Sequence, residues 1–267
     1  MKKYLSFFQL RFTMGLQYRA AAWAGVVTQF FWGAMEIMVF CAFYRADASA
    51  FPMTLQETVS YVWLQQAFLA MFASWMVDNE IFESIMSGDI AYELCRPINI
   101  YNMWFSRGVA LRTSKAVLRC FPILIVAFLL PKPYGISAPD SIMVFFCFGI
   151  TLIIGLFVIV AFFNIVYVIT FFTVSPRGIR ILVMSGLEFF TGAIIPIPFF
   201  PDKLAKVMEL LPFASMQNVP LRIYSGNIAG KEMANAMILQ IIWLILFVLV
   251  GKVLCQIAEK KVCIQGG

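Results

Sequence analysis

Three ionisable residues lie within stretches apolar enough to cross a membrane: Glu36, Arg119 and Glu188. Charge at that depth is costly, so such residues either pair with one another or form a proton or cargo site. Counting about 1.5 Å per residue from the expected helix ends allows Arg119 to pair with Glu36 and Lys115 to pair with Glu188. We expect structural ion pairs, with a proton or cargo site as the alternative. Arg112 and Lys115 lie nearer the boundary, and we expect them to extend to the lipid headgroups.

Other residue types exclude most enzyme chemistry. The chain contains no histidine, which removes the commonest general base and the usual Ser-His and Cys-His pairs. Its six cysteines form no C-x-x-C pair, so we expect neither a disulfide framework nor a metal site.

The sequence SGNIAGKE at residues 225–232 comes closest to a phosphate-binding loop. Its two glycines are one residue too close together, and Glu232 stands where a magnesium-binding hydroxyl is required. We therefore expect no nucleotide site and no enzyme activity in this chain. An ATP-driven process would need ATP and magnesium on another polypeptide.

The composition predicts an all-α integral membrane protein. The chain is 62% hydrophobic and 13% charged, with a mean hydropathy of +0.87, whereas soluble domains are about 45–50% apolar. Its apolar runs approach the roughly 20 residues that cross a bilayer. We expect six transmembrane helices within a single domain of residues 1–267, at about 20–44, 57–77, 108–130, 141–175, 179–197 and 233–253.

The distribution of basic residues predicts the orientation. If both termini are cytosolic, the inner segments carry fourteen of the 20 Lys and Arg residues and the outer segments carry six. Cytosolic loops of membrane proteins carry this excess of positive charge. We therefore place both termini and residues 78–107 in the cytosol.

Residues 1–19 interleave basic and apolar residues, a pattern typical of an amphipathic helix in the membrane interface. A signal peptide is the alternative, but Gln9 and Arg11 interrupt the apolar core that such a peptide needs. We expect a retained interfacial helix.

Ala21 and Gly25, four residues apart in the first span, form a pair of small residues on one helix face. Such a pair lets another helix approach closely, so these residues are candidates for a seam between two subunits. Small residues are also frequent in membrane helices, so ordinary packing is the alternative.

Residues 78–107 form the longest polar interruption and hold five of the 14 acidic residues. Apolar residues recur in its first part at helical spacing, and Gly88 then provides a stop. We expect a short cytosolic helix that docks in a groove of a partner protein, with a solvated loop as the alternative. The predicted docking residues are Glu80, Ile81, Phe82, Glu83, Ile85, Met86 and Asp89.

Residues 198–232 are too short for two crossings and too apolar for a free loop. Backbone at membrane depth must be hydrogen-bonded within helices or covered by protein. We therefore expect short re-entrant helices at the outer face before the last span, bounded by the helix breakers Pro196, Pro198, Pro201 and Pro212.

Together, the six spans, the N-terminal helix, GDIAYELCRP at residues 88–97 and IPIPFFPDKLAKVMELLPF at residues 195–213 resemble the half-size permeases of ABC-2-type exporters. The resemblance implies a multi-pass protein of the bacterial cytoplasmic (inner) membrane. It implies two permeases, identical or related, bound to cytosolic ABC ATPase subunits that hold ATP and magnesium. Residues from Asp78 to about Tyr92 would be the coupling helix seated on the ATPase, and the first and fifth spans would line the dimer seam and the cargo path.

We therefore expect a permease that exports an amphipathic molecule such as a peptide, antibiotic, lipid or glycolipid. We expect the permease to contact membrane lipid and not to bind nucleic acid. The first alternative is a self-sufficient secondary transporter or channel that uses Glu36, Arg119 and Glu188. An intramembrane enzyme is the second alternative, disfavoured by the missing histidine.

Overall fold

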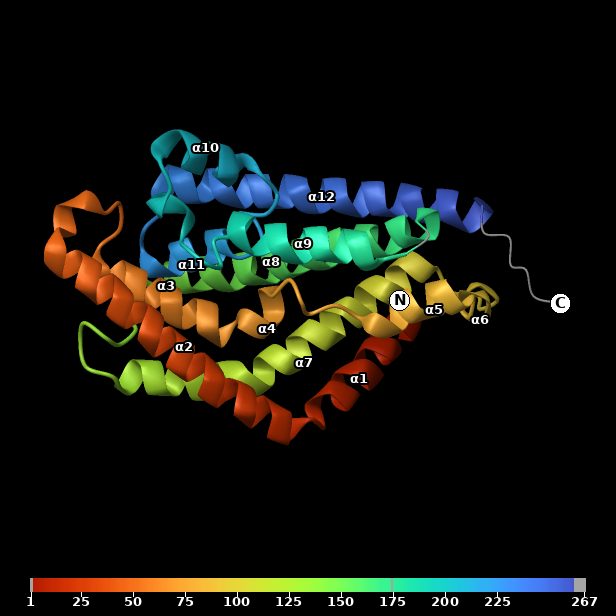
Figure 1. Ribbon diagram of the computed structural model, residues 1–267, viewed down its shortest axis with the longest axis horizontal. Helices are drawn as coiled ribbons and strands as arrows, with labels where there is room; N and C mark the ends of the chain where they lie inside the picture. The colour runs from red at the N-terminus through yellow and green to blue at the C-terminus, as the bar shows by residue number, and fades with distance from the viewer. Residues whose placement is uncertain (1, 174, 262–267) are drawn as a thin grey trace.

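The computed structural model describes residues 2–173 and 175–261, and this part of the chain is helical without any strand (Figure 1). The all-α expectation is confirmed. Among the described residues, three helices are long and apolar enough to cross a membrane. They are α2 (Arg19–Ala46), α8 (Ile142–Ile169) with its 3-10 extension η2 (Thr170–Phe172), and α12 (Gly230–Lys261).

The other three expected spans differ from a simple crossing. The second is broken at Phe68 into α3 (Leu55–Ala67) and α4 (Leu69–Phe72), so it ends five residues before the expected Val77. The fifth is α9 (Arg177–Phe190), whose 14 residues end before the proline-rich segment. The third, α7 (Ile100–Leu129), is long but carries four basic residues. The six-span arrangement therefore stays a prediction.

The polar segment of residues 78–107 is shorter than expected. It folds into α5 (Asn79–Ser87) and α6 (Ile90–Leu94), and its last eight residues already belong to α7. Asn99 begins α7 by accepting a hydrogen bond from the backbone N–H of Asn102 at 3.0 Å, as an N-cap residue does.

The long helices run roughly along one direction and define two ends (Figure 1). The α5–α6 end carries α5 and α6, and α12 also finishes there. The α10–α11 end carries α10 (Asp202–Leu210), α11 (Asn218–Ser225) and the connections that follow α2 and α7, including η1 (Ala48–Ala50). The segments predicted to be cytosolic, α5, α6 and the end of α12, thus lie at one end. The segments predicted to lie outside, α10, α11 and the connections that follow α2 and α7, lie at the other end.

The helix α3 is buried along most of its length. It contacts α2, α7 and α11, and its Tyr61 and Trp63 are at most 1% exposed. The helix α12 packs along α8, and α1 (Lys2–Leu16) packs along α7. By contrast α9 lies at the surface and buries only Val183 and Leu187.

Buried polar side chains of α3 bind the irregular backbone that follows α9. The Tyr61 hydroxyl donates to the carbonyl of Gly192 at 3.0 Å, and Gln65 Nε2 donates to the carbonyl of Ala193 at 2.7 Å. Non-helical backbone at membrane depth needs such partners because no water is present to replace them. Polar groups in α3 therefore hold the start of the segment that leads to η3 (Ile197–Phe199).

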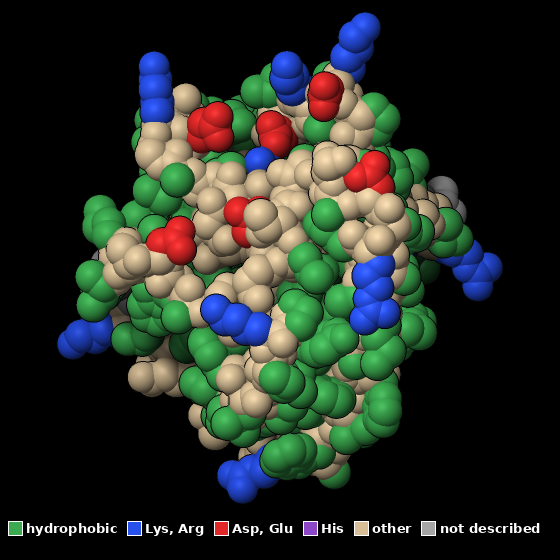
Figure 2. All heavy atoms as spheres, turned by 90° about the vertical axis from the view of Figure 1, so that its left-hand side faces the viewer, with side chains coloured by type: hydrophobic (Ala, Val, Ile, Leu, Met, Phe, Trp, Pro, Cys, Tyr) green, Lys and Arg blue, Asp and Glu red, His purple; other side chains and the backbone are tan. Residues whose placement is uncertain are grey.

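The α10–α11 end has an uneven surface (Figure 2). Acidic side chains gather in the upper half of this view, and hydrophobic side chains dominate the lower half.

Candidate functional site

A cavity of about 970 Å³ lies between α2, α3, α4, α9 and the segment that leads to η3. Glu36 on α2 and Glu188 on α9 both line it, and we call it the Glu36–Glu188 cavity. The rest of its wall combines glutamine side chains with many apolar and aromatic ones. Two of the three predicted intramembrane charges therefore share one cavity.

Neither glutamate forms the ion pair that the sequence suggested. Glu36 Oε2 accepts a hydrogen bond from Gln66 Nε2 at 3.4 Å, and Glu188 Oε1 accepts one from the Ser74 hydroxyl at 2.8 Å. The four ion pairs among the described residues include neither carboxylate. The pairings with Arg119 and Lys115 are wrong, because depth along a helix does not fix the direction in which a side chain points.

Several polar atoms at this cavity have no hydrogen-bond partner within the described chain. Both amide atoms of Gln29, Oε1 of Glu36, Oε1 of Gln65 and Nε2 of Gln217 are buried and unpaired. Buried polar groups are normally hydrogen-bonded, so each unpaired one needs an explanation. A ligand with polar groups would supply the missing partners.

Arg119 lies elsewhere, in a second cavity of about 460 Å³ between α1, α2 and α7, which we call the Arg119 cavity. Lys115 and Ala21 also line it. Within the described residues Arg119 has no ion pair, and its Nε is buried and unpaired. Lys115 Nζ donates a hydrogen bond to the sulfur of Met76 at 3.1 Å and has no ion pair among the described residues.

Gly25, a predicted seam residue, packs against Arg119 of the same chain. A Cβ atom at Gly25 would lie 2.7 Å from Arg119 Cζ, too close for a real contact. The small residue therefore makes room for a side chain within this subunit, and its role at a subunit seam stays a prediction. Ala21 is exposed, and its role at a seam stays a prediction.

Arg112 does not extend to the lipid headgroups. Its side chain is 2% exposed, and its Nη atoms donate to the carbonyls of Met71 and Met76 at 2.8 Å and of Ala73 at 3.2 Å. These carbonyls lie where α4 ends and the chain is irregular. The guanidinium thus replaces helical hydrogen bonds, a role the sequence could not indicate because the break after Ala67 was not foreseen.

Two residues define the ends of α5. The Asp78 carboxylate accepts a hydrogen bond from the backbone N–H of Glu80 at 3.2 Å and caps the N-terminus. Gly88 ends the helix with φ of 84°, a left-handed conformation that glycine adopts without steric cost. The predicted short helix is therefore present.

An ion-pair network joins α5 to α7 and α1. Arg107 of α7 donates to both carboxylate oxygens of Asp78 and also to Glu80, and Arg11 of α1 pairs with Glu80 at 3.2 Å. Arg107 is 5% exposed. Burial raises the pKa of Glu80, but Arg107 and Arg11 lower it more, so the net shift is downward. Sequence reasoning treated Glu80 as a docking residue and missed this network, although Asp78 and Arg107 bound the segment that it singled out.

Two predicted docking residues are unavailable to a partner in this structure. Ile81 and Phe82 are 1% and 2% exposed, and the Phe82 ring packs edge-on against Tyr167 with centroids 4.9 Å apart. Their periodicity marked the apolar face of α5 correctly, but that face covers the protein's own core. Four of the predicted docking residues, Glu80, Glu83, Met86 and Asp89, are exposed, and Ile85 is half-buried; Tyr92, not foreseen as a docking residue, is also exposed.

The predicted breakers bound short elements at the α10–α11 end. Pro196 precedes η3, Pro198 lies in its first turn, Pro201 precedes α10, and Pro212 follows the end of α10. The expected short helices are present as α10 and α11. Their re-entrant placement in a membrane stays a prediction.

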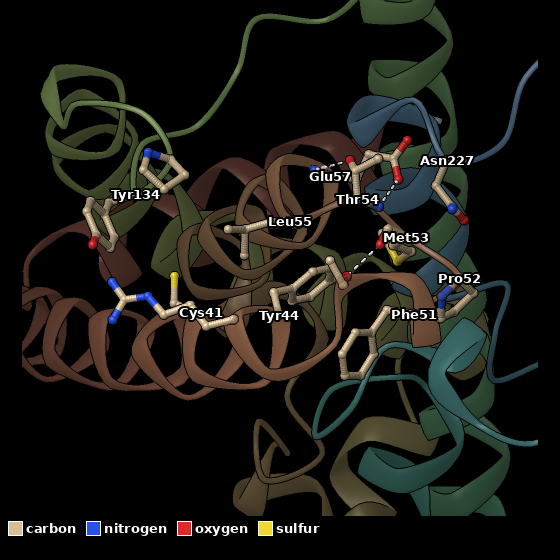
Figure 3. A pocket seen from close by; sticks show the side chains of 13 residues that line it. Cys41, Tyr44, Phe51, Pro52, Met53, Thr54, Leu55, Glu57, Tyr134 and Asn227 are labelled. Carbon is tan, nitrogen blue, oxygen red and sulfur yellow. Dashed lines mark hydrogen bonds between the residues drawn. The ribbon is translucent and has the colours of Figure 1, made fainter.

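A third cavity, of about 670 Å³, opens near η1 (Figure 3). The Tyr44 hydroxyl donates to the carbonyl of Met53 at 2.6 Å, and Thr54 and Glu57 cap α3 reciprocally (Figure 3). The polar groups of Tyr44, Thr54 and Glu57 thus have partners, unlike several of those at the Glu36–Glu188 cavity. We therefore take the Glu36–Glu188 cavity and the α5–α6 surface as the candidate site.

No group of three His, Cys, Asp or Glu residues within the described ranges could hold a metal ion.

Comparison with known proteins identifies the family. A model described as ABC-2 family transporter protein matches residues 30–266, which is most of the chain. No curated protein and no solved structure gives a significant match. The match begins inside α2 and covers Glu36, Glu188, α5 and α6, and the α10–α11 end, while α1 and the first part of α2 lie before it. This chain belongs to the ABC-2 family of membrane transporter proteins.

Proposed function

We propose that this chain is the permease subunit of an ATP-driven exporter of amphipathic molecules. In this proposal residues 1–267 form a single transmembrane domain with six spans and cytosolic termini. A separate cytosolic ABC ATPase binds ATP and magnesium, and two permeases, identical or related, enclose the cargo path.

The Glu36–Glu188 cavity is the observation that carries the proposal. Its volume of about 970 Å³ lies in the usual range for ligand sites of roughly 300–1,000 Å³. Its wall is largely apolar, with a few polar groups that lack partners. An apolar wall with few polar groups suits a cargo with one apolar part and one polar part.

The connections of α5 support a coupling role. Motion of α5 would pass to α7 through Asp78 and Arg107 and to α1 through Glu80 and Arg11. The exposed side of α5 and α6 remains open to a partner, with Met86 55% exposed. A partner ATPase seated there would therefore move α7, which packs against α2 and α3.

Exposed apolar faces support a second permease or a lipid contact. Phe31 and Met38 on α2 are 68% and 67% exposed, and Leu182 on α9 is 73% exposed. Because α2 and α9 also border the Glu36–Glu188 cavity, a second subunit against these faces would enclose the cargo.

Photo-crosslinking in the intact membrane tests the proposal. A benzophenone amino acid is placed at Tyr92 of the tagged full chain, with a matched chain labelled at Leu210 of α10, which is also exposed. We expect the first chain to form an adduct with an ABC ATPase, identified by peptide sequencing, and the second to form none. An adduct from Leu210 alone, or an ATPase adduct from neither position, overturns the proposed coupling surface.

The alternative of a self-sufficient secondary transporter has less support. It needs Glu36, Arg119 and Glu188 to act together, but Arg119 lines a different cavity. Transport by proteoliposomes that contain this chain and no ATPase would favour that alternative.

A further inference from the structure

The charge of the Glu36–Glu188 cavity is unbalanced. Among the residues that the structure describes, two carboxylates line it and no Lys or Arg does. Their hydrogen-bond partners in the described chain, Gln66 and Ser74, are neutral. A carboxylate removed from bulk water needs a cation, a metal or a proton to offset the cost of burial.

The basic residues of the neighbouring α7 bind other groups or line the other cavity. Arg107 binds Asp78 and Glu80, and Arg112 binds three backbone carbonyls. Arg119 and Lys115 line the Arg119 cavity. The described chain therefore offers the two glutamates no cation of its own.

A row of polar groups on α2 adds a second, independent observation. Gln29 precedes Glu36 by seven residues, about two helical turns, so both lie on one face of α2. The Gln29 side chain is 4% exposed, lines the cavity, and has no partner for either amide atom. This result does not depend on which amide atom is the oxygen.

Gly33 shapes the middle of this row. A Cβ atom there would lie 2.9 Å from Gln66 Cγ, so the missing side chain lets Gln66 reach α2 between Gln29 and Glu36. Gln66 then donates to Glu36 Oε2 and leaves Oε1 of the same carboxylate unpaired. Acceptor atoms at Glu36 and Gln29 are thus available to a donor from a ligand.

Aromatic side chains form much of the remaining wall. Aromatic ring faces attract cations and also accept apolar groups. Those that line the cavity are Trp32, Phe40, Phe43, Phe51, Phe72, Trp75 and Phe199.

We infer that the Glu36–Glu188 cavity takes an amphipathic cation, with its positive group held by Glu36, Gln29 and Glu188 and its apolar body among the aromatic side chains. The inference rests on the proposed function, because it names the cargo class of the same cavity. In this arrangement the carboxylates select for positive charge. The aromatic wall alone would also accept neutral and anionic molecules of the same shape.

Two probes of nearly equal shape and opposite charge test the inference. Tetraphenylphosphonium is a cation and tetraphenylborate an anion, and each is titrated into the full chain in nanodiscs, with empty nanodiscs to correct for partition into lipid. We expect the cation to bind at least about tenfold more tightly than the anion. We expect Glu36→Gln to remove about tenfold of the affinity for the cation and little of that for the anion.

The matched control is Glu232→Gln, the same chemical change at an exposed residue at the start of α12 outside the cavity. It should leave both affinities unchanged. Equal binding of both probes by the unaltered chain overturns the inference whether or not any variant folds. Equal cation affinity in folded Glu36→Gln also overturns it.

Failure of this inference is distinguishable from failure of the proposed function. ATP-dependent transport of a neutral amphipathic molecule by the complex, without selective cation binding, would keep the exporter and exclude the cation. Selective cation binding by a chain that never associates with an ATPase would keep the cation site and exclude the ATP-driven exporter.

Discussion

Arg107 of α7 donates two hydrogen bonds to the carboxylate of Asp78, the residue that caps α5. The pair is buried, with side-chain exposures of 5% and 10%, and it connects residues that are 29 positions apart. It fixes the start of the predicted coupling helix to a helix that packs against α2 and α3. A displacement of α5 therefore has a direct route toward the helices that line the Glu36–Glu188 cavity.

Removal of the Asp78 carboxylate should destabilise the protein strongly. Asp78→Ala leaves the buried guanidinium of Arg107 with only Glu80 as an acidic partner and removes the cap of α5, so we expect a loss of about 3–5 kcal/mol in the free energy of unfolding. Glu83→Ala, an exposed acid on the same helix, should change it by less than about 0.5 kcal/mol. Unfolding of both purified variants in detergent checks this, and equal losses would contradict a structural role for the pair.

The Glu80 ion pairs should respond to pH in a defined direction. Burial raises the pKa of Glu80, but Arg107 and Arg11 lower it more, so it lies below its usual value of 4.5. The stabilisation is therefore present above pH 4.5 and is lost as the pH falls through the lowered pKa. Tm measured against pH for the unaltered chain and for Glu80→Gln should show a constant difference from pH 8 to about 5.5 that shrinks below about pH 4.5. A difference that grows on acidification would contradict the shift.

Arg112 should matter more to stability than Arg119, although the two lie two turns apart on α7. Arg112→Ala leaves three buried carbonyls without their donor, which should cost about 3 kcal/mol or more. Arg119→Ala removes a side chain that has no ion pair in the described chain, and its cost should be below about 1 kcal/mol. Thermal unfolding of both variants compares them directly. Equal losses of stability would contradict the role of Arg112 as the donor to these three carbonyls.

Much of the fold follows from hydropathy and helix breakers, but the direction of side chains does not. The helical content, the short helix that begins after Asp78 and the elements bounded by Pro201 and Pro212 were predicted. The pairing of Arg119 with Glu36 was wrong, because depth counted along each helix leaves its rotation undefined. The Glu36–Glu188 cavity depends on that rotation.

The apolar face of α5 shows a second limit of sequence reasoning. Periodicity identified Ile81 and Phe82 as one face, but it cannot tell whether a partner or the same chain covers that face. Tyr167, which contacts Phe82, lies 85 residues further along the chain. Contacts over such separations are set by packing and leave no local pattern.

Gly25 should tolerate enlargement poorly because Arg119 occupies the adjacent space. Gly25→Leu forces the Arg119 guanidinium out of its position, and we expect a loss of about 1–3 kcal/mol in stability without a change in oligomeric state. Ala21→Leu, one turn earlier at an exposed position, should leave stability unchanged within about 0.5 kcal/mol. Unfolding together with size measurement by light scattering separates these results. Loss of a dimer in Gly25→Leu at unchanged stability would instead place Gly25 at a subunit seam.

The exposed side of α5 and α6, and not its buried face, should determine association with the ATPase. Met86→Glu and Tyr92→Glu place charge on side chains that are 55% and 73% exposed, so the fold should be retained while ATPase binding weakens by about tenfold or more. Leu210→Glu on α10 makes the same change at the opposite end and should leave binding intact. Co-purification of the tagged chain with the ATPase measures the effect, and Tm confirms that each variant folds. Loss of association in Ile81→Glu alone, at an unchanged Tm, would contradict this prediction. It would mean that the buried face of α5 turns toward the partner and that its contacts with Tyr167 and Arg107 do not hold it in place.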